Sequence, residues 1–156
     1  MRIIGIDPGT GILGFGVIEI KRDNVVLLDA GVITTPAHTP LEERLEEIHN
    51  SLSDIISENQ PHAMSIEKLF FNRNVTTAMS VSHARGVAML AGQKAGLTIH
   101  EYTPLEIKMA ITSYGKADKK QVQEMVRILL KLKHIPKPDD AADALAAALT
   151  HAQSMR

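Results

Sequence analysis

The chain has 156 residues, of which 44% are hydrophobic and 22% charged, and its formal net charge is −1. These values are ordinary for a globular protein of one domain, and they exclude a disordered or fibrous chain. The absence of cysteine excludes disulfides and thiolate metal sites. No apolar run approaches the ~20 residues that a membrane span needs, and the N-terminus lacks a signal-peptide pattern, so we expect a cytoplasmic protein without membrane contact.

The first predicted element is a short apolar strand, Arg2–Asp7, around which the rest of the chain is organised. Its three isoleucines are typical of a central strand buried on both faces, and Gly5 leaves room for a neighbouring backbone. The strand ends at Asp7, where Pro8 favours an extended backbone. A carboxylate is therefore predicted at the rigid end of a buried strand, a good place to hold a metal ion.

A glycine-rich turn follows, and residues 9–14 match the G-x-G-x-x-G spacing of dinucleotide-binding proteins. That motif requires a helix to begin at its end, whereas residues 15–21 are rich in β-formers and contain a glycine. Asp23 and Asn24 then turn the chain into another apolar strand over residues 25–34. This succession predicts an antiparallel meander, so we reject the dinucleotide-binding interpretation.

A helix is predicted to follow, with Thr39 as its capping residue, a proline in its first turn and a glutamate three residues on. Its apolar residues keep helical period, so one face is expected to pack on the sheet. The helix stops before Pro61, and a short strand over residues 63–66 then ends in Glu67. A strand after a long helix implies a parallel crossover, which places it next to the first strand.

The next segments predict a connection, a helix and a fifth strand. Residues 68–74 form a polar and aromatic connection. The helix over residues 75–95 is rich in alanine and glycine, which permits close backbone approach. A strand over residues 97–102 follows it.

The remaining chain is expected to form three helices. Thr103 begins a second capping box, Asp118 caps the next helix, and the last helix covers residues 139–152. Charge is uneven here, because residues 108–137 hold eight Lys or Arg and two acids, whereas residues 42–58 hold six acids and one Arg. This asymmetry suggests one basic face on a near-neutral protein, although two solvated helix faces of opposite sign would give the same pattern.

Acidic residues stand in unusual settings at three places. Asp7 and Glu67 end two strands predicted to be adjacent and parallel, so their side chains are expected to converge at one edge of the sheet. Asp140 and Asp143 are three residues apart near the start of an alanine-rich helix, which would lie close against the sheet. Four carboxylates in one cleft repel each other, and bound Mg²⁺ or Mn²⁺ would offset the repulsion. Two such ions ~3.5–4 Å apart activate water in phosphodiester cleavage.

Each acid alone has a simpler interpretation. Asp139 or Asp140 would serve as a helix N-cap, and Asp143 would complement the helix dipole. Glu67 would only mark the end of a strand, and an aspartate before Pro-Gly is common in turns. Their combination favours the metal site. The seven histidines are scattered and form no ligand pair, so we interpret them as surface or packing residues.

Five segments, in order and spacing, resemble the RuvC family of Holliday-junction resolvases over essentially the whole chain. They are IGIDPGT (residues 4–10), IE (66–67), ARGVA (84–88), VQEMV (122–126) and DAADAL (140–145). The resemblance implies an α/β fold of the RNase H-like kind, a five-stranded mixed sheet flanked by helices, as one nuclease domain over residues 1–156. It also implies that the family's four catalytic, metal-binding acids are Asp7, Glu67, Asp140 and Asp143. Asp140 is preferred to Asp139 because the D-x-x-D spacing reaches Asp143 from it.

The resemblance also implies contacts with DNA. Phe70 matches an aromatic residue associated with base stacking at the junction, and Lys108 and Lys119 match basic residues near the active site. An exposed ring directly after Glu67 would stack on an unpaired base, at ~1–3 kcal/mol per base. The alternative is that Phe70, or its neighbour Phe71, packs beneath the connection.

Further basic residues are predicted to bind DNA. Lys116 and Lys120 lie with Lys119 around a helix start, a favourable place for phosphate, with plain solubility as the alternative. Arg73, in the connection after Glu67, completes the predicted DNA contacts.

The resulting hypothesis is a structure-specific endonuclease that resolves Holliday junctions in recombination and DNA repair. Two Mg²⁺ ions, for which Mn²⁺ would substitute, activate a water that attacks the scissile phosphorus in line and leaves a 5′-phosphate and a 3′-hydroxyl. The near two-fold symmetry of a four-way junction calls for a homodimer, with the helix over residues 75–95 as its candidate interface and ordinary sheet packing as the alternative. The resemblance implies the branch-migration proteins RuvA and RuvB as partners.

Other classes of function stay open from the sequence. One is a different RNase H-like nuclease that acts on an RNA–DNA hybrid or another branched substrate. Another is a junction-binding module without catalysis, which the intact set of acids argues against. The phosphate loop of actin-like ATPases superficially matches residues 7–16, but the chain is too short for the two lobes of such an ATPase.

Overall fold

The computed structural model describes residues 1–22, 24–69 and 75–155. Its five strands form one mixed sheet in the order β3-β2-β1-β4-β5. The strands are β1 (Arg2–Asp7), β2 (Ile12–Lys21), β3 (Asn24–Thr34), β4 (Ala63–Glu67) and β5 (Thr98–Tyr102). The first three are antiparallel neighbours, and β4 and β5 run parallel to β1. The predicted meander and the predicted parallel crossover are both confirmed.

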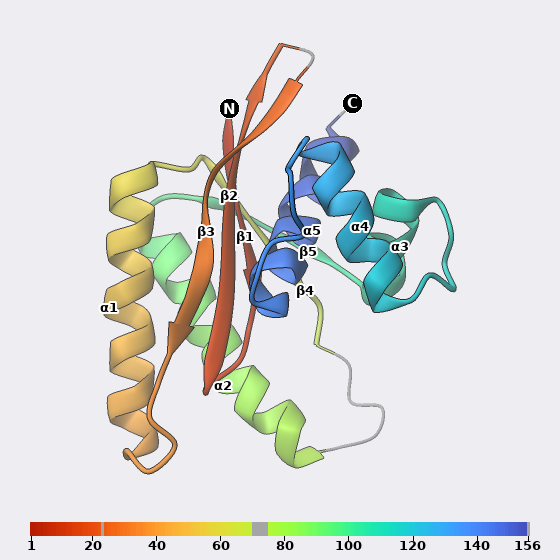
Figure 1. Cartoon of the computed structure of the whole chain (residues 1–156). Helices are drawn as coiled ribbons and strands as arrows, with labels where there is room; N and C mark the ends of the chain where they lie inside the picture. Colours follow the sequence, from red (N-terminus) through yellow and green to blue (C-terminus); the bar gives the residue numbers. More distant parts are fainter. Residues whose placement is uncertain (23, 70–74, 156) are drawn as a thin grey trace.

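Helices cover both faces of this sheet (Figure 1). They are α1 (Leu41–Asn59), α2 (Val75–Lys94), α3 (Pro104–Thr112), α4 (Lys119–Leu129) and α5 (Asp139–Ser154). One core cluster joins the sheet to α1 and α2, and a second joins the other face to α3, α4 and α5. Among the described residues, no helix has the length and apolarity to cross a membrane.

Element boundaries follow the predictions with two differences. The strand β2 begins at Ile12 rather than at residue 15, because its ladder with β3 already starts at the Ile12–Thr34 pair. The expected Thr39 cap is wrong. α1 begins after Pro40, which holds the capping position without a side-chain bond, while the Thr39 amide donates to the carbonyl of Pro36. The capping boxes at Thr103 and Asp118 are present as predicted.

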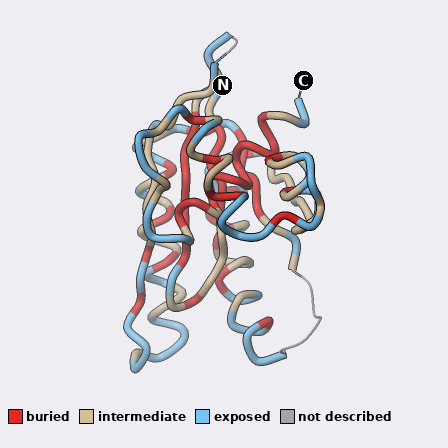
Figure 2. Tube along the Cα trace, turned by 45° about the vertical axis from the view of Figure 1, so that its right-hand side comes forward, coloured by how far each residue is buried: buried red, intermediate tan, exposed pale blue. Residues whose placement is uncertain are grey.

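The last helix, α5, lies directly on the central strands. A Cβ added to Gly5 of β1 would lie 1.9 Å from the carbonyl oxygen of Ala144, so only glycine admits this approach. The Ser65 hydroxyl of β4 donates to the Ala147 carbonyl at 2.6 Å and fixes the helix on the sheet. Almost every residue of α5 from position 141 to 152 is buried (Figure 2). The predicted close packing of the alanine-rich helix is confirmed.

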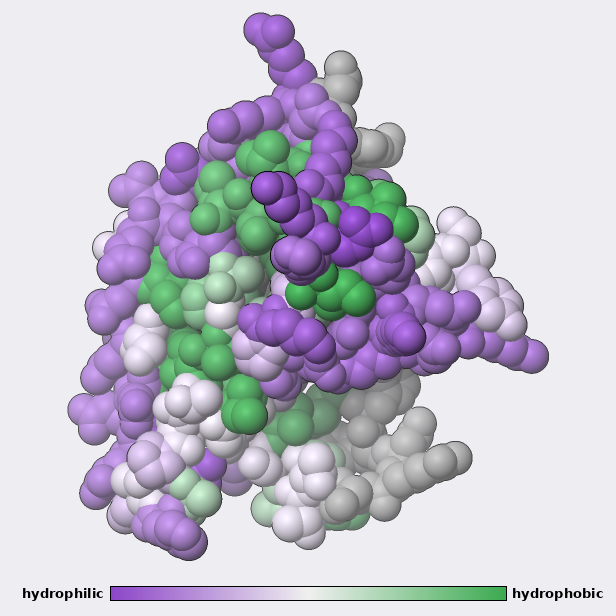
Figure 3. Space-filling model, in the orientation of Figure 1, coloured by the Kyte–Doolittle hydropathy of each residue, from purple (hydrophilic) through white to green (hydrophobic). Residues whose placement is uncertain are grey.

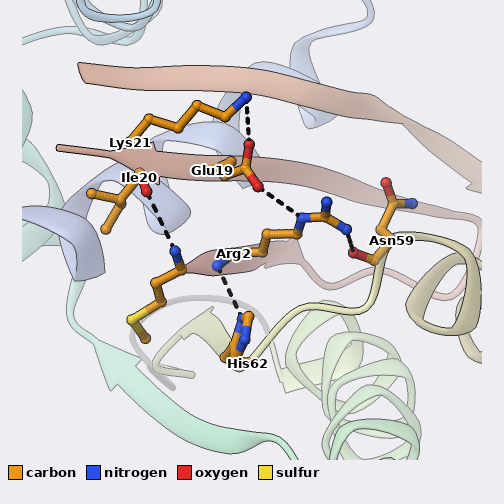
Figure 4. A network of polar contacts seen from close by, with 7 residues as sticks. Arg2, Glu19, Ile20, Lys21, Asn59 and His62 are labelled. Carbon is orange, nitrogen blue, oxygen red and sulfur yellow. Dashed lines mark hydrogen bonds and ion pairs between the residues drawn. The ribbon is translucent and has the colours of Figure 1, made fainter.

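Arg2 anchors the opposite end of β1 (Figure 4). Its guanidinium bonds the Glu19 carboxylate at 3.1 Å and the Asn59 carbonyl at 2.7 Å, and its amide donates to His62. Lys21 holds the other oxygen of Glu19 at 2.9 Å. These contacts attach β1 to β2, to the end of α1 and to the start of β4. They therefore help to fix the position of β1 and of Asp7 at its other end.

Candidate active site

Two of the four predicted acids end neighbouring parallel strands. Asp7 is the last residue of β1, and Glu67 is the last residue of β4. The β1–β4 register pairs Ile6 with Ile66, so the next residue of each strand is Asp7 and Glu67, respectively. The ladder therefore brings both carboxylates to the same end of the sheet, as predicted.

The start of α5 supplies the other two acids. Asp7 is paired across β1 and β2 with Gly14. A Cβ at Gly14 would lie 2.1 Å from the carbonyl oxygen of Asp140, so the first turn of α5 crosses directly over this pair. Asp140 and Asp143 consequently face Asp7. This approach requires glycine at position 14 of β2, because a larger residue would collide with the backbone of Asp140.

Burial and mutual repulsion perturb the carboxyl groups at this point. Burial, then the charges of Asp143, Asp140 and Glu67, and a hydrogen bond with Asp140 raise the pKa of Asp7 to about 8. Burial likewise raises the pKa of Glu67, with a further contribution from Asp143. Burial also raises the pKa of Asp143, against the lowering effect of Lys119. The site therefore holds more negative charge than the described side chains around it balance.

Two lysines partly compensate for this charge. Lys119, the first residue of α4, places its Nζ 3.0 Å from Oδ2 of Asp143, and this bond is the main cause that raises the lysine's pKa. Lys108 of α3 lowers the pKa of Glu67. Both lysines line a cavity of about 250 Å³ together with Glu67 and Asp143. The structure thus brings the two predicted lysines to the acids.

Asp139 lies apart from the acid cluster. Its side chain is 50% exposed and stands 3.9 Å from both Lys119 and Lys137. Asp140, in contrast, is the residue that interacts with Asp7. Neither residue caps α5, because Pro138 holds the capping position and no side chain bonds the helix start. The simpler interpretation of these aspartates as N-caps is therefore wrong.

The donor set fits a hard divalent cation, because all four side chains offer carboxylate oxygens. Within the described ranges, however, no group of three or more His, Asp or Glu side chains has an arrangement that could already hold a metal ion. Lys119 contributes to this, since its ammonium is bonded to Asp143. The backbone of β1, β4 and α5 nevertheless holds the four carboxylates at one end of the sheet, close enough for Asp143, Asp140 and Glu67 to raise the pKa of Asp7.

The other predicted DNA contacts lie farther from the acids or beyond the described residues. Lys116 is exposed, and Lys120 lines a separate cavity of about 460 Å³ with Tyr114. Ala117 and Asp118 line both cavities and so lie between them. The side formed by α3 and α4 is mostly hydrophilic (Figure 3). Phe70, Phe71 and Arg73 lie outside the residues that the structure describes.

Two contacts beside the site were not predicted from the sequence. The hydroxyl of buried Thr10, in the turn after Asp7, donates to the Ser80 carbonyl of α2 at 2.6 Å. Arg85 of α2 donates from Nε to the Glu67 carbonyl at 3.1 Å. Arg85 belongs to the segment 84–88, one of the five that carry the family resemblance, but nothing in the sequence indicates which strand end its side chain reaches.

A mixed sheet of three antiparallel and two parallel strands, with acids where β1 and β4 end, defines an α/β protein of the RNase H-like class. The model of the family crossover junction endodeoxyribonuclease RuvC matches residues 3–151. The chain belongs to this family. A crossover junction endodeoxyribonuclease RuvC of Desulfitobacterium hafniense is 54% identical over 155 residues, covering 99% of this chain and 94% of that one. Its counterpart in Heliobacterium modesticaldum is 52% identical, with 99% and 96% covered.

Solved structures agree with this assignment. The chain is similar to Thermus thermophilus RuvC with a TM-score of 0.93 and 37% identity, covering 100% of this chain and 96% of that one. The same relative in complex with a Holliday junction substrate gives a TM-score of 0.94 and 38% identity, covering 100% and 95%. The yeast mitochondrial resolvase Ydc2, at 13% identity and a TM-score of 0.66, shares the fold. The predicted fold, family and endonuclease class are confirmed.

Proposed function

We propose that the four carboxylates at the ends of β1 and β4 and the start of α5 are the catalytic centre of this crossover junction endodeoxyribonuclease. The observation that carries the proposal is the convergence of Asp7, Glu67 and the first turn of α5 at one end of the sheet, where burial and three other acids raise the pKa of Asp7 to about 8. Strongly perturbed carboxyls concentrate at functional sites. The substrate is a Holliday junction, as in the complex of the Thermus relative, and residues 1–156 act as one nuclease domain.

RuvC-family enzymes are metal-dependent nucleases. The hard oxygen donors favour two Mg²⁺ ions per site, with Mn²⁺ as a substitute, held by Asp7, Glu67, Asp140 and Asp143. When bound, such ions polarise the scissile phosphate and increase the acidity of the attacking water. The half-exposed position of Asp139 favours Asp140 as the third ligand.

The lysines of the site act on the DNA. Lys108 and Lys119 line the cavity beside Glu67 and Asp143, where an ammonium group would pair with phosphate oxygens and hold the scissile bond over the carboxylates. Lys116 and Lys120 extend this basic surface, and Phe70 and Arg73 remain proposed DNA contacts. Hydrolysis at this position leaves a 5′-phosphate and a 3′-hydroxyl. Cellular DNA as the substrate agrees with action in the cytoplasm.

A homodimer through α2 would match the two-fold symmetry of the junction. The inner face of α2 is buried, but Met79 and Leu90 are 55% and 53% exposed on its outer side. Gly86 lies between them at helical spacing and has nothing within 4 Å of an added Cβ, so a second helix would be able to approach closely. Sheet packing and an interface therefore use opposite faces of α2. Family membership supports RuvA and RuvB as further partners.

Cleavage of a synthetic four-way junction tests the catalytic proposal. With Mg²⁺, the wild type is expected to give paired nicks, whereas Asp7→Asn binds the junction without cutting it. Asp139→Asn is the matched control and retains cleavage, because that side chain faces solvent. Cutting by Asp7→Asn at the wild-type rate would contradict the proposal, and preference for an RNA–DNA hybrid would favour another RNase H-like activity.

A further inference from the structure

Arg85 makes a set of contacts at the end of β4 that the proposed chemistry does not use. Its side chain is only 16% exposed. Nε donates to the carbonyl oxygen of Glu67 at 3.1 Å, the guanidinium forms an ion pair with Glu101 of β5, and Nη1 lies 3.3 Å from the Met89 sulfur. One side chain of α2 therefore joins two parallel strands at the point where β4 leaves the sheet.

The bonded carbonyl belongs to the residue that carries a proposed catalytic carboxylate. The β1–β4 register ends at the Ile6–Ile66 pair, one residue before Glu67. On the β5 side, the Lys68 amide donates to the Tyr102 carbonyl at 2.8 Å. Arg85 and this backbone bond thus hold the peptide unit after Glu67 from two directions, which restricts the backbone from which the Glu67 side chain projects.

A partly buried guanidinium is a costly way to pack a helix on a sheet, because its charge loses hydration. Burial lowers the pKa of Arg85, which is the sign of the desolvation that its charge undergoes. A leucine at this position would fill the space between α2 and the sheet without that penalty. What it would not supply is a directional donor to the Glu67 carbonyl. The contact therefore has a use beyond packing.

We propose that Arg85 is a positioning residue that fixes the orientation of the Glu67 carboxylate and, through it, the affinity of the site for divalent cations. This inference rests on the proposed metal site. Residues that orient metal ligands without touching the metal typically change its affinity by 10- to 100-fold when they are replaced. Ligand geometry of this kind depends on support from rigid elements, and here α2 and β5 provide it.

Mn²⁺ binding to the full-length protein without DNA, followed by electron paramagnetic resonance, tests the inference. Arg85→Met, which keeps an unbranched side chain but has no donor where arginine has Nε, is expected to weaken Mn²⁺ binding by roughly tenfold. In a Glu67→Gln background the same substitution is expected to have no further effect, because the carboxylate on which Arg85 acts is gone. Arg85→Lys, which keeps the charge but lacks the Nε donor, is expected to weaken binding as well, and it replaces the methionine variant should that variant fail to fold.

Glu101→Gln is the matched control. It removes the ion pair with Arg85 but leaves the Nε bond to the Glu67 carbonyl, so Mn²⁺ affinity is expected to stay within about twofold. An equal loss in Glu101→Gln and Arg85→Met would show that Arg85 only attaches α2 to β5 and would overturn the inference. An Arg85→Met effect that persists unchanged in the Glu67→Gln background would overturn it as well.

The two proposals fail in different ways. If Glu67→Gln itself leaves Mn²⁺ binding unchanged, the proposed metal site is wrong. If Glu67→Gln weakens binding but neither Arg85 variant does, only the role of Arg85 is wrong. Junction affinity in metal-free buffer is a second readout, and it is expected to be unchanged in Arg85→Met because Arg85 does not line the cavity that holds Lys108 and Lys119.

Discussion

Asp7 shows how a single carboxyl links folding to the site. Three sequence features indicated it: a wholly apolar strand, an acid at its end and a proline directly after it. The sequence also predicted the positions of Glu67, Asp140 and Asp143, because a strand end and an alanine-rich helix limit where their side chains lie. The contacts of Arg85 and Thr10 could not be predicted, because they depend on which turn of α2 lies over which strand end.

The raised pKa of Asp7 makes the stability of the metal-free protein dependent on pH. Between its ordinary value of 3.8 and about 8, the folded protein keeps a proton that the unfolded chain releases, so the free energy of unfolding falls as pH rises through this window. Asp7→Asn removes the effect. We expect this variant to gain about 2 kcal/mol over the wild type at pH 8 and little at pH 4. Urea unfolding in EDTA measures both values, and an equal gain at the two pH values would contradict the prediction.

Lys119 is expected to matter less to stability when divalent cations are present. Lys119→Met leaves the Asp143 carboxylate without its ammonium partner, which should destabilise the metal-free protein by about 0.5 kcal/mol for so exposed a pair. Mg²⁺ would neutralise the same carboxylate, so the difference from the wild type should shrink at saturating Mg²⁺. Thermal unfolding with EDTA and with Mg²⁺ tests this. Lys120→Met, next along α4, is the control and should show no such dependence.

At the scale of elements, the contact between α5 and the central strands is the condition for the site. The sequence predicted the helices and strands of the described residues from several signals, which were helical period in α1 and α4, apolar runs in the strands, and capping residues or small residues in the other helices. The Thr39 cap was wrong because Pro40, with its extended backbone, itself takes the position before the helix. Close packing of α5 was predictable from its alanines, whereas its direction across Gly14, which sets the place of Asp140, was not.

Gly5→Ala tests the contact between α5 and β1. Its Cβ would meet the Ala144 backbone at 1.9 Å, and backbone atoms of a buried helix cannot move aside locally. We expect a loss of about 3 kcal/mol in the free energy of unfolding, with reduced junction cleavage because α5 carries two of the acids. Gly11→Ala is the control: its Cβ meets only Arg44 at 3.5 Å, and the expected change is within about 0.5 kcal/mol. Chemical denaturation measures the free energy of unfolding of both variants, and an equal loss in the two would contradict the prediction.

For the whole molecule, the sheet order followed from the sequence because few topologies satisfy a meander and a right-handed crossover together. The two faces of the sheet are covered by different helices. One carries α1 and α2, and the other carries α5 with α3 and α4, where the basic residues gather. The sequence suggested α2 as the interface of the proposed homodimer but not which of its faces would be used, because an exposed apolar residue on α2 looks the same in a sequence as a buried one.

Leu90→Glu is expected to disrupt the proposed dimer. The substitution places a charge on the exposed face of α2 that carries Met79, Gly86 and Leu90, where a second copy would have to desolvate it. Sedimentation equilibrium should then report a monomer whose free energy of unfolding per chain is little changed, and paired cleavage should be lost. Leu105→Glu is the control, since this leucine is 59% exposed on α3. A dimeric Leu90→Glu variant would rule out this face as the interface.

The position of α5 in the chain has a consequence during synthesis. All five strands precede it, yet it contributes half of the acids and much of one core cluster. A nascent polypeptide therefore carries no complete set of carboxylates until its final helix has been translated and has docked. If the proposed catalytic centre is correct, cleavage activity is therefore expected only after α5 has docked on the sheet.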